Sequence, residues 1–284
     1  MLNVLSVDVE EYFQVEAFAR SVDRRTWASF APRVDGNVRR VLDLFDRHDA
    51  KATFFVLGWI GRQYPHLVRE IAARGHEIGC HGFGHQRLHE LTRKEFRADL
   101  REALGILTDQ AQQPIRAYRA PSFSIVKHTM WAFDILAEEG FTFDSSIFPV
   151  HHDNYGVPDA PRFPYIHQTK EGNSVYEFPP STVRIANQNI GVGGGGYLRF
   201  APYSVTRWAL RRINRVERQP AMVYFHPWEI DPAQPRISAP MRSRLRHYTN
   251  LATMEHKIGR LLRDFRFVPL SAHPQNLSGE ASPA

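Results

Sequence analysis

Short apolar runs alternate with longer amphipathic segments along most of the chain. The apolar runs lie at residues 2–7, 52–57, 76–80, 115–118, 141–143, 174–178, 221–225 and 265–270. Segments with the periodicity of a helix lie between several of them, at residues 38–48, 65–74, 92–108 and 129–139. Thr92 and Glu95 have the spacing of a helix capping box at the start of the third segment. Strands that alternate with helices of this length predict βαβ units and a parallel sheet.

Two segments interrupt this alternation. Residues 149–172 are rich in proline and polar side chains and predict a long loop. Residues 187–200 contain consecutive glycines at 193–196, which predict either a flexible turn or a loop that contacts the substrate. Taken together, the strands predict an α/β protein with one irregular barrel over residues 1–270. We expect residues 241–264 to be a helical extension packed on this barrel, and residues 271–284 to be a flexible tail.

Length and composition favour one large folded domain. The 284 residues are 43% hydrophobic and 12% aromatic, which supports a sizeable core. The net charge is +6, and basic residues cluster at 207–218 and 236–246. Solvated helix faces explain such clusters, and contact with an acidic polymer or a membrane surface is the alternative. The sequence has no nucleic-acid motif, so we expect no nucleic-acid partner, and the oligomeric state stays open.

The single cysteine and the start of the chain bear on the compartment. Cys80 has no partner for a disulfide within the chain, and its apolar neighbours predict a packed core residue. The first strand begins almost directly after Met1, without a basic leader, and no apolar stretch is long enough to span a membrane. These features predict a cytoplasmic protein, with the inner face of the membrane as the alternative location.

Polar residues directly follow the apolar runs at five places in the sequence. These five residues are Asp8, His81, Arg119, Asp144 and His226. In barrel enzymes the active site lies at the carboxyl ends of the strands, where such residues meet. The sequence therefore predicts that these residues form one site.

Two histidines with glycines between them indicate a metal site. His81 and His85 are four positions apart, and on a helical turn such residues lie on the same face. Imidazole is a common zinc ligand, and a site needs at least one further ligand. Asp8 and Glu10 point to the same side of a strand end, so one can bind the ion while the other accepts a proton from water. Glu11 is the reserve candidate for the third ligand.

The other polar residues each have a functional and a structural interpretation. Arg119 can pair with a catalytic carboxylate, or form a surface ion pair. His226 can act as a general acid, or be a hydrogen-bonded core histidine. Asp144 can orient His226 by accepting a hydrogen bond from its ring, or be a turn residue. His89 continues the histidine spacing but is predicted to lie on a helix surface, outside the site.

Five motifs in this order resemble those of the polysaccharide deacetylase family, which is carbohydrate esterase family 4 with the NodB-homology domain. They are Asp8-Val9-Glu10, His81 with His85, Arg119-Ala120-Pro121, Asp144-Ser145-Ser146 and Tyr224-Phe225-His226. Residues 8–15, 193–200 and 226–231 further resemble the subgroup linked to exopolysaccharide production in exosortase-type gene clusters. The resemblance spans most of the chain and implies an irregular (β/α)7 barrel that removes acetyl groups from N-acetylated sugars.

The resemblance also implies a set of roles. Asp8 would be the general base, held by Arg119, and a divalent metal, usually zinc, would be bound by Glu10, His81 and His85. The backbone N–H of Ser122 would lie near the oxyanion. His226 would protonate the leaving amine, tuned by Asp144. Three aromatic residues can stack on sugar rings or pack in the core, namely Phe123, Tyr197 and Trp228.

One departure from the family pattern leaves the substrate class open. Most members have two adjacent aspartates where this chain has Asp8-Val9-Glu10 followed by Glu11. Our main hypothesis is metal-dependent deacetylation of N-acetylhexosamine units in a polysaccharide or lipid-linked glycan, within exopolysaccharide biosynthesis. The alternatives are a metal-independent, allantoinase-like amidase acting on a cyclic ureide, and a glycan-binding protein with a degenerate site.

Overall fold

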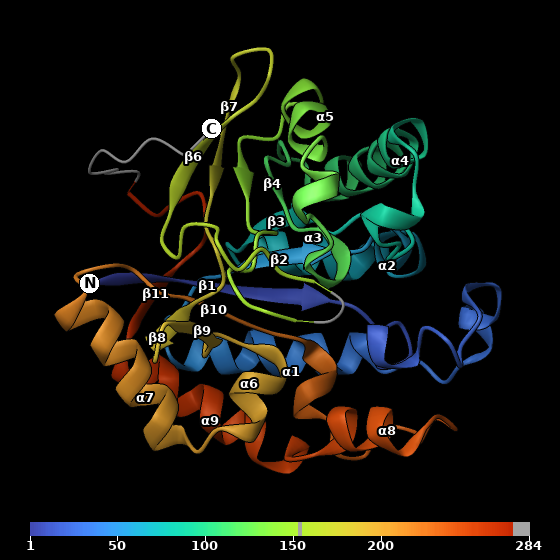
Figure 1. The fold of residues 1–284 in the computed structure, drawn as a ribbon. Helices are drawn as coiled ribbons and strands as arrows, with labels where there is room; N and C mark the ends of the chain where they lie inside the picture. Colours follow the sequence, from blue (N-terminus) through green and yellow to red (C-terminus); the bar gives the residue numbers. More distant parts are fainter. Residues whose placement is uncertain (153–154, 275–284) are drawn as a thin grey trace.

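A curled sheet with helices on its outer surface makes up the fold of the computed structural model, which describes residues 1–152 and 155–274 (Figure 1). Seven parallel strands are paired in the order β10-β1-β2-β3-β4-β5-β7. Their bounds are β1 Leu2–Val9, β2 Thr53–Val56, β3 Glu77–Cys80, β4 Ala117–Tyr118, β5 Phe143–Asp144, β7 Ser174–Glu177 and β10 Met222–Phe225.

Two further strands extend this sheet. β6 (Tyr165–Gln168) pairs antiparallel with β7, and β11 (Arg266–Val268) pairs with β1 beside β10. Within the described residues no ladder joins β10 to β6, so the sheet is a half-barrel and not a closed barrel. The predicted α/β class is confirmed, and the predicted irregular barrel takes the form of this half-barrel. The extra antiparallel strand was not predicted.

Helices lie on both sides of β1 in Figure 1, with α4 and α5 on one side and α1, α7 and α9 on the other. The bounds are α1 Val34–Arg47, α2 Gly58–Gln63, α3 Pro65–Ala73, α4 Arg93–Ala111, α5 Ala132–Glu138, α6 Gly195–Phe200, α7 Tyr203–Arg211, α8 Met241–Tyr248 and α9 Leu251–Asp264. The capping box of α4 is confirmed, because the Glu95 backbone N–H donates to Thr92 Oγ1 and the Thr92 backbone N–H donates to the Glu95 carboxylate. No helix in the described part of the chain is both long and apolar enough to cross a membrane.

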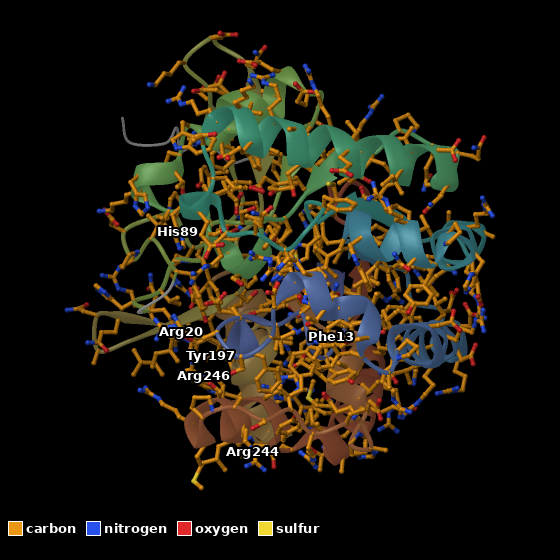
Figure 2. All side chains as sticks on the ribbon, turned by 90° about the vertical axis from the view of Figure 1, so that its right-hand side faces the viewer. Phe13, Arg20, His89, Tyr197, Arg244 and Arg246 are labelled. Atoms are coloured by element: carbon orange, nitrogen blue, oxygen red, sulfur yellow. The ribbon has the colours of Figure 1, made fainter. Side chains whose placement is uncertain are left out.

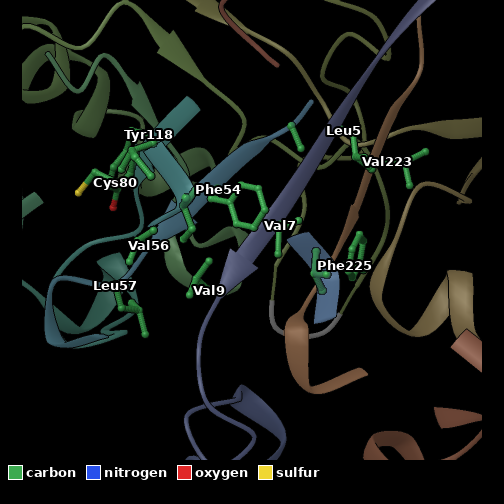
Figure 3. Close-up of a cluster of buried hydrophobic side chains, with 14 of the residues drawn as sticks. Leu5, Val7, Val9, Phe54, Val56, Leu57, Cys80, Tyr118, Val223 and Phe225 are labelled. Atoms are coloured by element: carbon green, nitrogen blue, oxygen red, sulfur yellow. The ribbon is translucent and has the colours of Figure 1, made fainter. Parts of the chain in front are cut away.

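The two faces of β1 have different surroundings. Leu5, Val7 and Val9 point outward into the large cluster that also contains the apolar side chains of α1 (Figure 3). Val4 points inward, into a separate cluster inside the curled sheet, and Asp8 lies on that inner face at the carboxyl end of the strand. Full burial of each apolar side chain stabilises the fold by roughly 1.5–3 kcal/mol. Because side chains alternate along a strand, burial of the outward residues also turns Asp8 to the inner face.

The two segments predicted as irregular are more ordered than expected. The predicted loop at residues 149–172 contains β6, and β9 (Gln188–Gly191) forms a hairpin with β8 (Thr182–Ile185). The glycine run packs on β10, since the Tyr224 backbone N–H donates to the Gly193 carbonyl at 2.8 Å. A Cβ on Gly194 would lie 2.2 Å from the Tyr224 carbonyl oxygen, so only glycine fits there. This run is therefore part of the packed sheet edge, and neither a flexible turn nor a free loop.

The predicted helical extension at residues 241–264 coincides with α8 and α9. α9 contributes Met254, Ile258 and Leu261 to the large buried cluster, so it packs against the same core as β1. Most of the tail predicted as flexible, residues 275–284, lies outside the described residues. The division of the chain into one barrel domain and a tail stays a prediction.

Candidate metal and acid–base site

Most of the polar residues predicted from strand ends lie together at one end of the sheet. Figure 2 faces this end, toward which β1 points, and labels Tyr197 of α6 among its side chains. Glu10, His81 and His85 are buried there, with one ligand atom of each within 4.8 Å of the others. The carboxyl ends of parallel strands bring them together, although they are about seventy residues apart in sequence.

The segment that carries the two histidines is a loop and not the helical turn expected from their spacing. Left-handed backbone at Gly82 (φ 73°) and His85 (φ 50°) folds the loop back, so that the two imidazole rings lie 5.4 Å apart. Asp99 of α4 holds this loop by accepting a hydrogen bond from the Phe83 backbone N–H at 2.8 Å. A tight turn, and not a helical turn, therefore brings the two imidazole rings together. Glycine is needed at position 82 because the backbone there has a positive φ.

His81 has its free nitrogen directed at the other two residues. Its Nδ1 lies 2.7 Å from the Arg119 carbonyl oxygen, which can only accept, so Nδ1 carries the proton and Nε2 keeps its lone pair. Burial lowers the pKa of His81 to about 4. The ring is therefore neutral near pH 7, the form that binds a metal.

Glu10 has one satisfied and one unsatisfied carboxylate oxygen. Oε1 accepts a hydrogen bond from Trp228 Nε1 at 3.1 Å. Oε2 is buried and has no hydrogen-bond partner, although His85 Nε2 lies only 2.9 Å away. Burial alone raises the pKa of Glu10, but the charges of His85 and His226 outweigh it and lower the pKa to about 2. Glu10 is thus an ionised carboxylate. Its Oε2 and the nitrogen of His85 face each other, as two ligands of the same metal ion do.

Glu11, the reserve candidate, is occupied elsewhere. Its Oε1 accepts hydrogen bonds from the backbone N–H groups of Arg33 (2.8 Å) and Val34 (3.0 Å) at the start of α1. A carboxylate at this position satisfies amides that have no partner within the helix and interacts favourably with the helix dipole. The structure thus places Glu10, and not Glu11, with the two histidines.

The set of Glu10, His81 and His85 fits a divalent cation. One carboxylate oxygen and two imidazole nitrogens are the donor set of many catalytic zinc sites, which keep the remaining position for water or substrate. The observation that favours this fit is the buried Glu10 Oε2, which makes no hydrogen bond and faces His85 Nε2 at 2.9 Å, because a shared cation would satisfy both atoms.

Asp8 is held by a buried arginine. Arg119 Nη1 donates to Asp8 Oδ1 at 2.6 Å and to Ser6 Oγ at 2.8 Å, and Arg119 Nε donates to the Ser145 carbonyl at 3.0 Å. The guanidinium has no exposed surface, so it is part of the interior and not of a surface ion pair. Asp8 Oδ2 remains free of this pair and lies 3.8 Å from His226 Nε2.

His226 faces both carboxylates from the end of β10. Its Nε2 lies 3.8 Å from Asp8 and 3.6 Å from Glu10, and its Nδ1 lies 3.1 Å from Glu229 Oε2. Burial lowers the pKa of His226, but the negative charges of Glu10, Glu229 and Asp8 outweigh it and raise the pKa to about 9. Near neutral pH the ring therefore carries a proton that it can donate.

Asp144 is not the partner of His226, contrary to the sequence-based expectation. Its Oδ2 accepts a hydrogen bond from Ser146 Oγ at 2.5 Å, and it is paired in register with Glu177 across β5 and β7. Glu229 takes the predicted place, because it lies three residues after His226 on the short helix η7 (Pro227–Ile230). That i, i+3 spacing is a signal in the sequence that could have identified Glu229.

Two family profiles match the chain, and together they cover most of the residues of the candidate site. The profile described as "Polysaccharide deacetylase" matches residues 24–142, and a profile described as a domain of unknown function, DUF3473, matches residues 145–273. Residues 24–142 are therefore similar to the polysaccharide deacetylase family. Asp8 and Glu10 precede the first match and His226 lies in the second, so the candidate site extends beyond residues 24–142.

Named relatives agree with this assignment. A peptidoglycan-N-acetylglucosamine deacetylase from Bacillus cereus is 33% identical over 94 residues, which are 33% of this chain and 34% of that protein. The chain spans 34%, 42% and 38% of the length of the first three curated relatives that it matches. These relatives are therefore similar over only part of their length.

Two solved structures share the deacetylase fold over nearly the whole chain. One is a protein from Mycobacterium smegmatis assigned to the polysaccharide deacetylases, with a TM-score of 0.60 and 19% identity, covering 99% of this chain and 94% of that one. The other is Puue allantoinase, with a TM-score of 0.58 and 15% identity, covering 94% of this chain and 85% of that one. At these identities the likeness concerns the fold alone.

Among the residues expected to contact a sugar, Trp228 is buried among other side chains. Its ring stacks on His226 at 5.1 Å and on His247 at 4.1 Å, and the side chain is 5% exposed. The expectation that Trp228 stacks on a sugar ring is therefore wrong. Its indole instead orders Glu10 through the hydrogen bond to Oε1.

The remaining substrate candidates lie beside the site. Phe123 is buried edge-on against Phe148 and Tyr224, so little of its ring faces outward. Tyr197 is half-buried and packs on the same cluster from α6. Ser122 has left-handed backbone (φ 54°) just after Arg119, which is a strained conformation of the kind found at functional sites. The roles of these residues stay predictions.

Proposed function

We propose that this protein is a metal-dependent hydrolase that removes N-acetyl groups from N-acetylhexosamine units of a glycan. The finer proposal is a polysaccharide or lipid-linked glycan in exopolysaccharide biosynthesis. The observation that carries the proposal is that the Glu10, His81 and His85 cluster adjoins the pair of Asp8 and His226, because His226 Nε2 lies 3.6 Å from Glu10 and 3.8 Å from Asp8. The B. cereus relative, which is named for peptidoglycan N-acetylglucosamine, supports the substrate class.

Asp8 is suited to be the general base. A divalent cation bound by Glu10, His81 and His85, which we propose to be zinc, would polarise the acetyl carbonyl and acidify a water molecule beside it. Asp8 Oδ2 takes a proton from the attacking water, while Oδ1 stays fixed by the charge-assisted hydrogen bond from Arg119.

His226 completes the reaction as the general acid. Its Nε2 faces the same space as Asp8 Oδ2, and it donates its proton to the amide nitrogen as the C–N bond breaks. Acetate and a free amino sugar are the products. The backbone N–H of Ser122 would stabilise the negative charge that develops on the carbonyl oxygen.

A metal-independent amidase acting on a cyclic ureide is the second candidate, since Puue allantoinase has the same fold. The buried Glu10 Oε2, which faces His85 Nε2 without a hydrogen bond, favours the metal-dependent candidate over this one. A glycan-binding protein without activity would need no base held by a buried arginine, so the Asp8–Arg119 pair argues against the third candidate.

A substrate panel tests the proposal. Zinc-loaded protein is incubated with N-acetylglucosamine oligomers and, separately, with cyclic ureides, and the release of acetate or of the opened ring is measured. We expect acetate release from the oligomers, with loss of activity in Asp8→Asn. Hydrolysis of ureides alone would support the second candidate, and identical behaviour of wild type and Asp8→Asn on every substrate would support a binding protein.

A further inference from the structure

A second buried ion pair lies close to the candidate site and has no role in the mechanism above. Arg199 Nη1 on α6 donates to Glu229 Oε1 on η7 at 2.5 Å. The two side chains are 3% and 0% exposed. Both residues belong to the region 145–273, which matches the profile of unknown function. A fully buried pair of this kind costs desolvation energy, so its position invites a functional explanation.

Glu229 fixes the orientation of His226 through one oxygen. Glu229 Oε2 accepts a hydrogen bond from the His226 backbone N–H at 2.9 Å and lies 3.1 Å from His226 Nδ1. Because a carboxylate can only accept, Nδ1 carries a proton and the ring turns its Nε2 toward Asp8 and Glu10. The backbone and the ring of His226 are thus anchored to the same atom.

Arg199 contacts the metal side of the site as well. Its guanidinium carbon lies 4.9 Å from the centre of the Trp228 ring, and Trp228 donates to Glu10 Oε1. One guanidinium therefore bonds to Glu229, which holds the candidate acid, and lies against the indole that donates to Glu10, so the proposed role of Arg199 concerns its bond to Glu229.

The backbone around Arg199 is itself fixed by α9 and by Asn250, the residue that precedes this helix. Lys257 Nζ donates to the carbonyls of Leu198 (2.6 Å) and Ala201 (2.7 Å), and Asn250 Nδ2 donates to the Arg199 carbonyl (3.1 Å). These carbonyls lie at the end of α6, where helical hydrogen bonds run out, so α9 supplies the missing donors.

The glycine run explains why α6 starts so close to the site. Gly194 forms a bridge with Tyr224 of β10, and α6 begins at the next residue. Arg199 follows four residues later, and η7 with Glu229 follows directly after β10. The absence of side chains in the run therefore lets the helix that carries Arg199 reach the end of β10.

We propose that Arg199 and Glu229 are positioning residues that hold His226 in its donating orientation. Region 145–273 would then supply both the acid and its support, and this is the function we assign to the region. The inference rests on the proposed function, because it concerns how His226 acts in that reaction.

Glu229→Gln and Arg199→Met test this proposal by steady-state kinetics with N-acetylglucosamine oligomers. An amide at 229 cannot accept hydrogen bonds from both His226 and Arg199, so we expect kcat to fall about 10–100-fold in each variant. KM and zinc content should stay within about twofold, and the double variant should lose no more than either single one, because both residues act by the same route. Arg199→Lys, which keeps the charge, should recover part of the activity.

A matched control exists in the same region. Arg162 and Glu217 form an ion pair at 2.9 Å, with both side chains 16% exposed, and the other hydrogen bonds of the Arg162 guanidinium in the described structure go to Thr182. Arg162→Met with Glu217→Gln should leave kcat unchanged. If the wild type is inactive on N-acetylated glycans, the proposed function fails. If the wild type is active and Glu229→Gln is equally active, the positioning role is wrong.

NMR of protein labelled with ¹⁵N-histidine gives a readout that does not depend on turnover or folding yield. The proton on His226 Nδ1 should give a downfield signal in the wild type and in the control, and this signal should shift or vanish in Glu229→Gln. An unchanged signal in Glu229→Gln would overturn the proposal.

Discussion

Two buried arginine–carboxylate pairs flank the candidate site, and they differ in what they hold. Arg119 binds Asp8, the candidate base, and both residues lie at strand ends inside the sheet. Arg199 binds Glu229, which in turn contacts the candidate acid, His226. One arginine thus acts on a reacting group directly and the other acts through an intermediate residue. The two pairs thus let the site combine a base from the first strand, Asp8, with an acid from the later region 145–273, His226.

The most damaging change should be the loss of the base itself. Asp8→Asn keeps the size of the side chain but removes the proton acceptor, so we expect kcat to fall about 10²–10⁴-fold. Steady-state acetate release measures this, with zinc content as the control for an intact metal site. If Glu229→Gln lowered kcat more than Asp8→Asn, Glu229 and not Asp8 would have to act directly in the reaction, which would contradict the assignment.

Arg119→Met should destabilise the fold strongly. Removing one member of a buried pair leaves the other charge without compensation, which typically costs about 3–5 kcal/mol. Arg119 also donates to Ser6 and Ser145, whereas Arg199 makes fewer such contacts with the sheet, so the loss should be larger at 119. Urea unfolding of both Met variants checks the order, and equal losses would contradict it.

Asp144 offers a contrast, because it is a buried carboxyl without an arginine bonded to it in the described structure. Burial raises the pKa of Asp144 to about 7, whereas Arg199 and His226 outweigh burial at Glu229 and lower its pKa. A raised pKa means that the contribution of Asp144 to stability is full below about pH 4 and is lost as the pH rises through about 7.

Asp144→Asn should remove the loss of stability that the Asp144 carboxyl causes as the pH rises. As the pH rises from 5 to 8, we expect the stability of the variant to increase relative to that of the wild type, by an amount on the order of 1 kcal/mol. Urea unfolding at the two pH values measures the difference, with Asp159→Asn at an exposed position as the control. A difference of opposite sign would show that Asp144 is ionised in the folded protein.

The smallest effect is expected at Glu11. Its carboxylate satisfies amides at the start of α1, and loss of such a cap costs about 0.5–2 kcal/mol. Glu11→Ala should therefore lower stability slightly and leave zinc binding unchanged, as measured by thermal unfolding and metal analysis. Loss of zinc in this variant would move the third ligand from Glu10 to Glu11.

The sequence was informative where a residue directly follows a buried strand. Asp8, His81, Arg119 and His226 could be placed from the apolar runs alone, because parallel strands end at one edge of the sheet. The family resemblance showed that the motifs occur in the family's order, but it favoured Asp144 as the partner of His226. In the structure the partner is Glu229.

The supporting residues were not predictable for a physical reason. Arg199 reaches Glu229 only because the glycine run packs on β10 and starts α6 there, a long-range contact without periodicity in the sequence. The choice between Glu10 and Glu11 also needed the position of α1, whose first amides bind Glu11. Short strands in polar segments, such as β6, lack the apolar run that identified the others.

Titration of metal-free protein with zinc, followed by acetate release from N-acetylglucosamine oligomers, tests the central claim most directly. The Glu10, His81 and His85 site predicts no release without metal and a rise to a plateau at one zinc per chain. Glu10→Gln should need a large excess of zinc to reach any activity, whereas Glu11→Gln should behave like the wild type. Full activity of the metal-free protein would contradict the account.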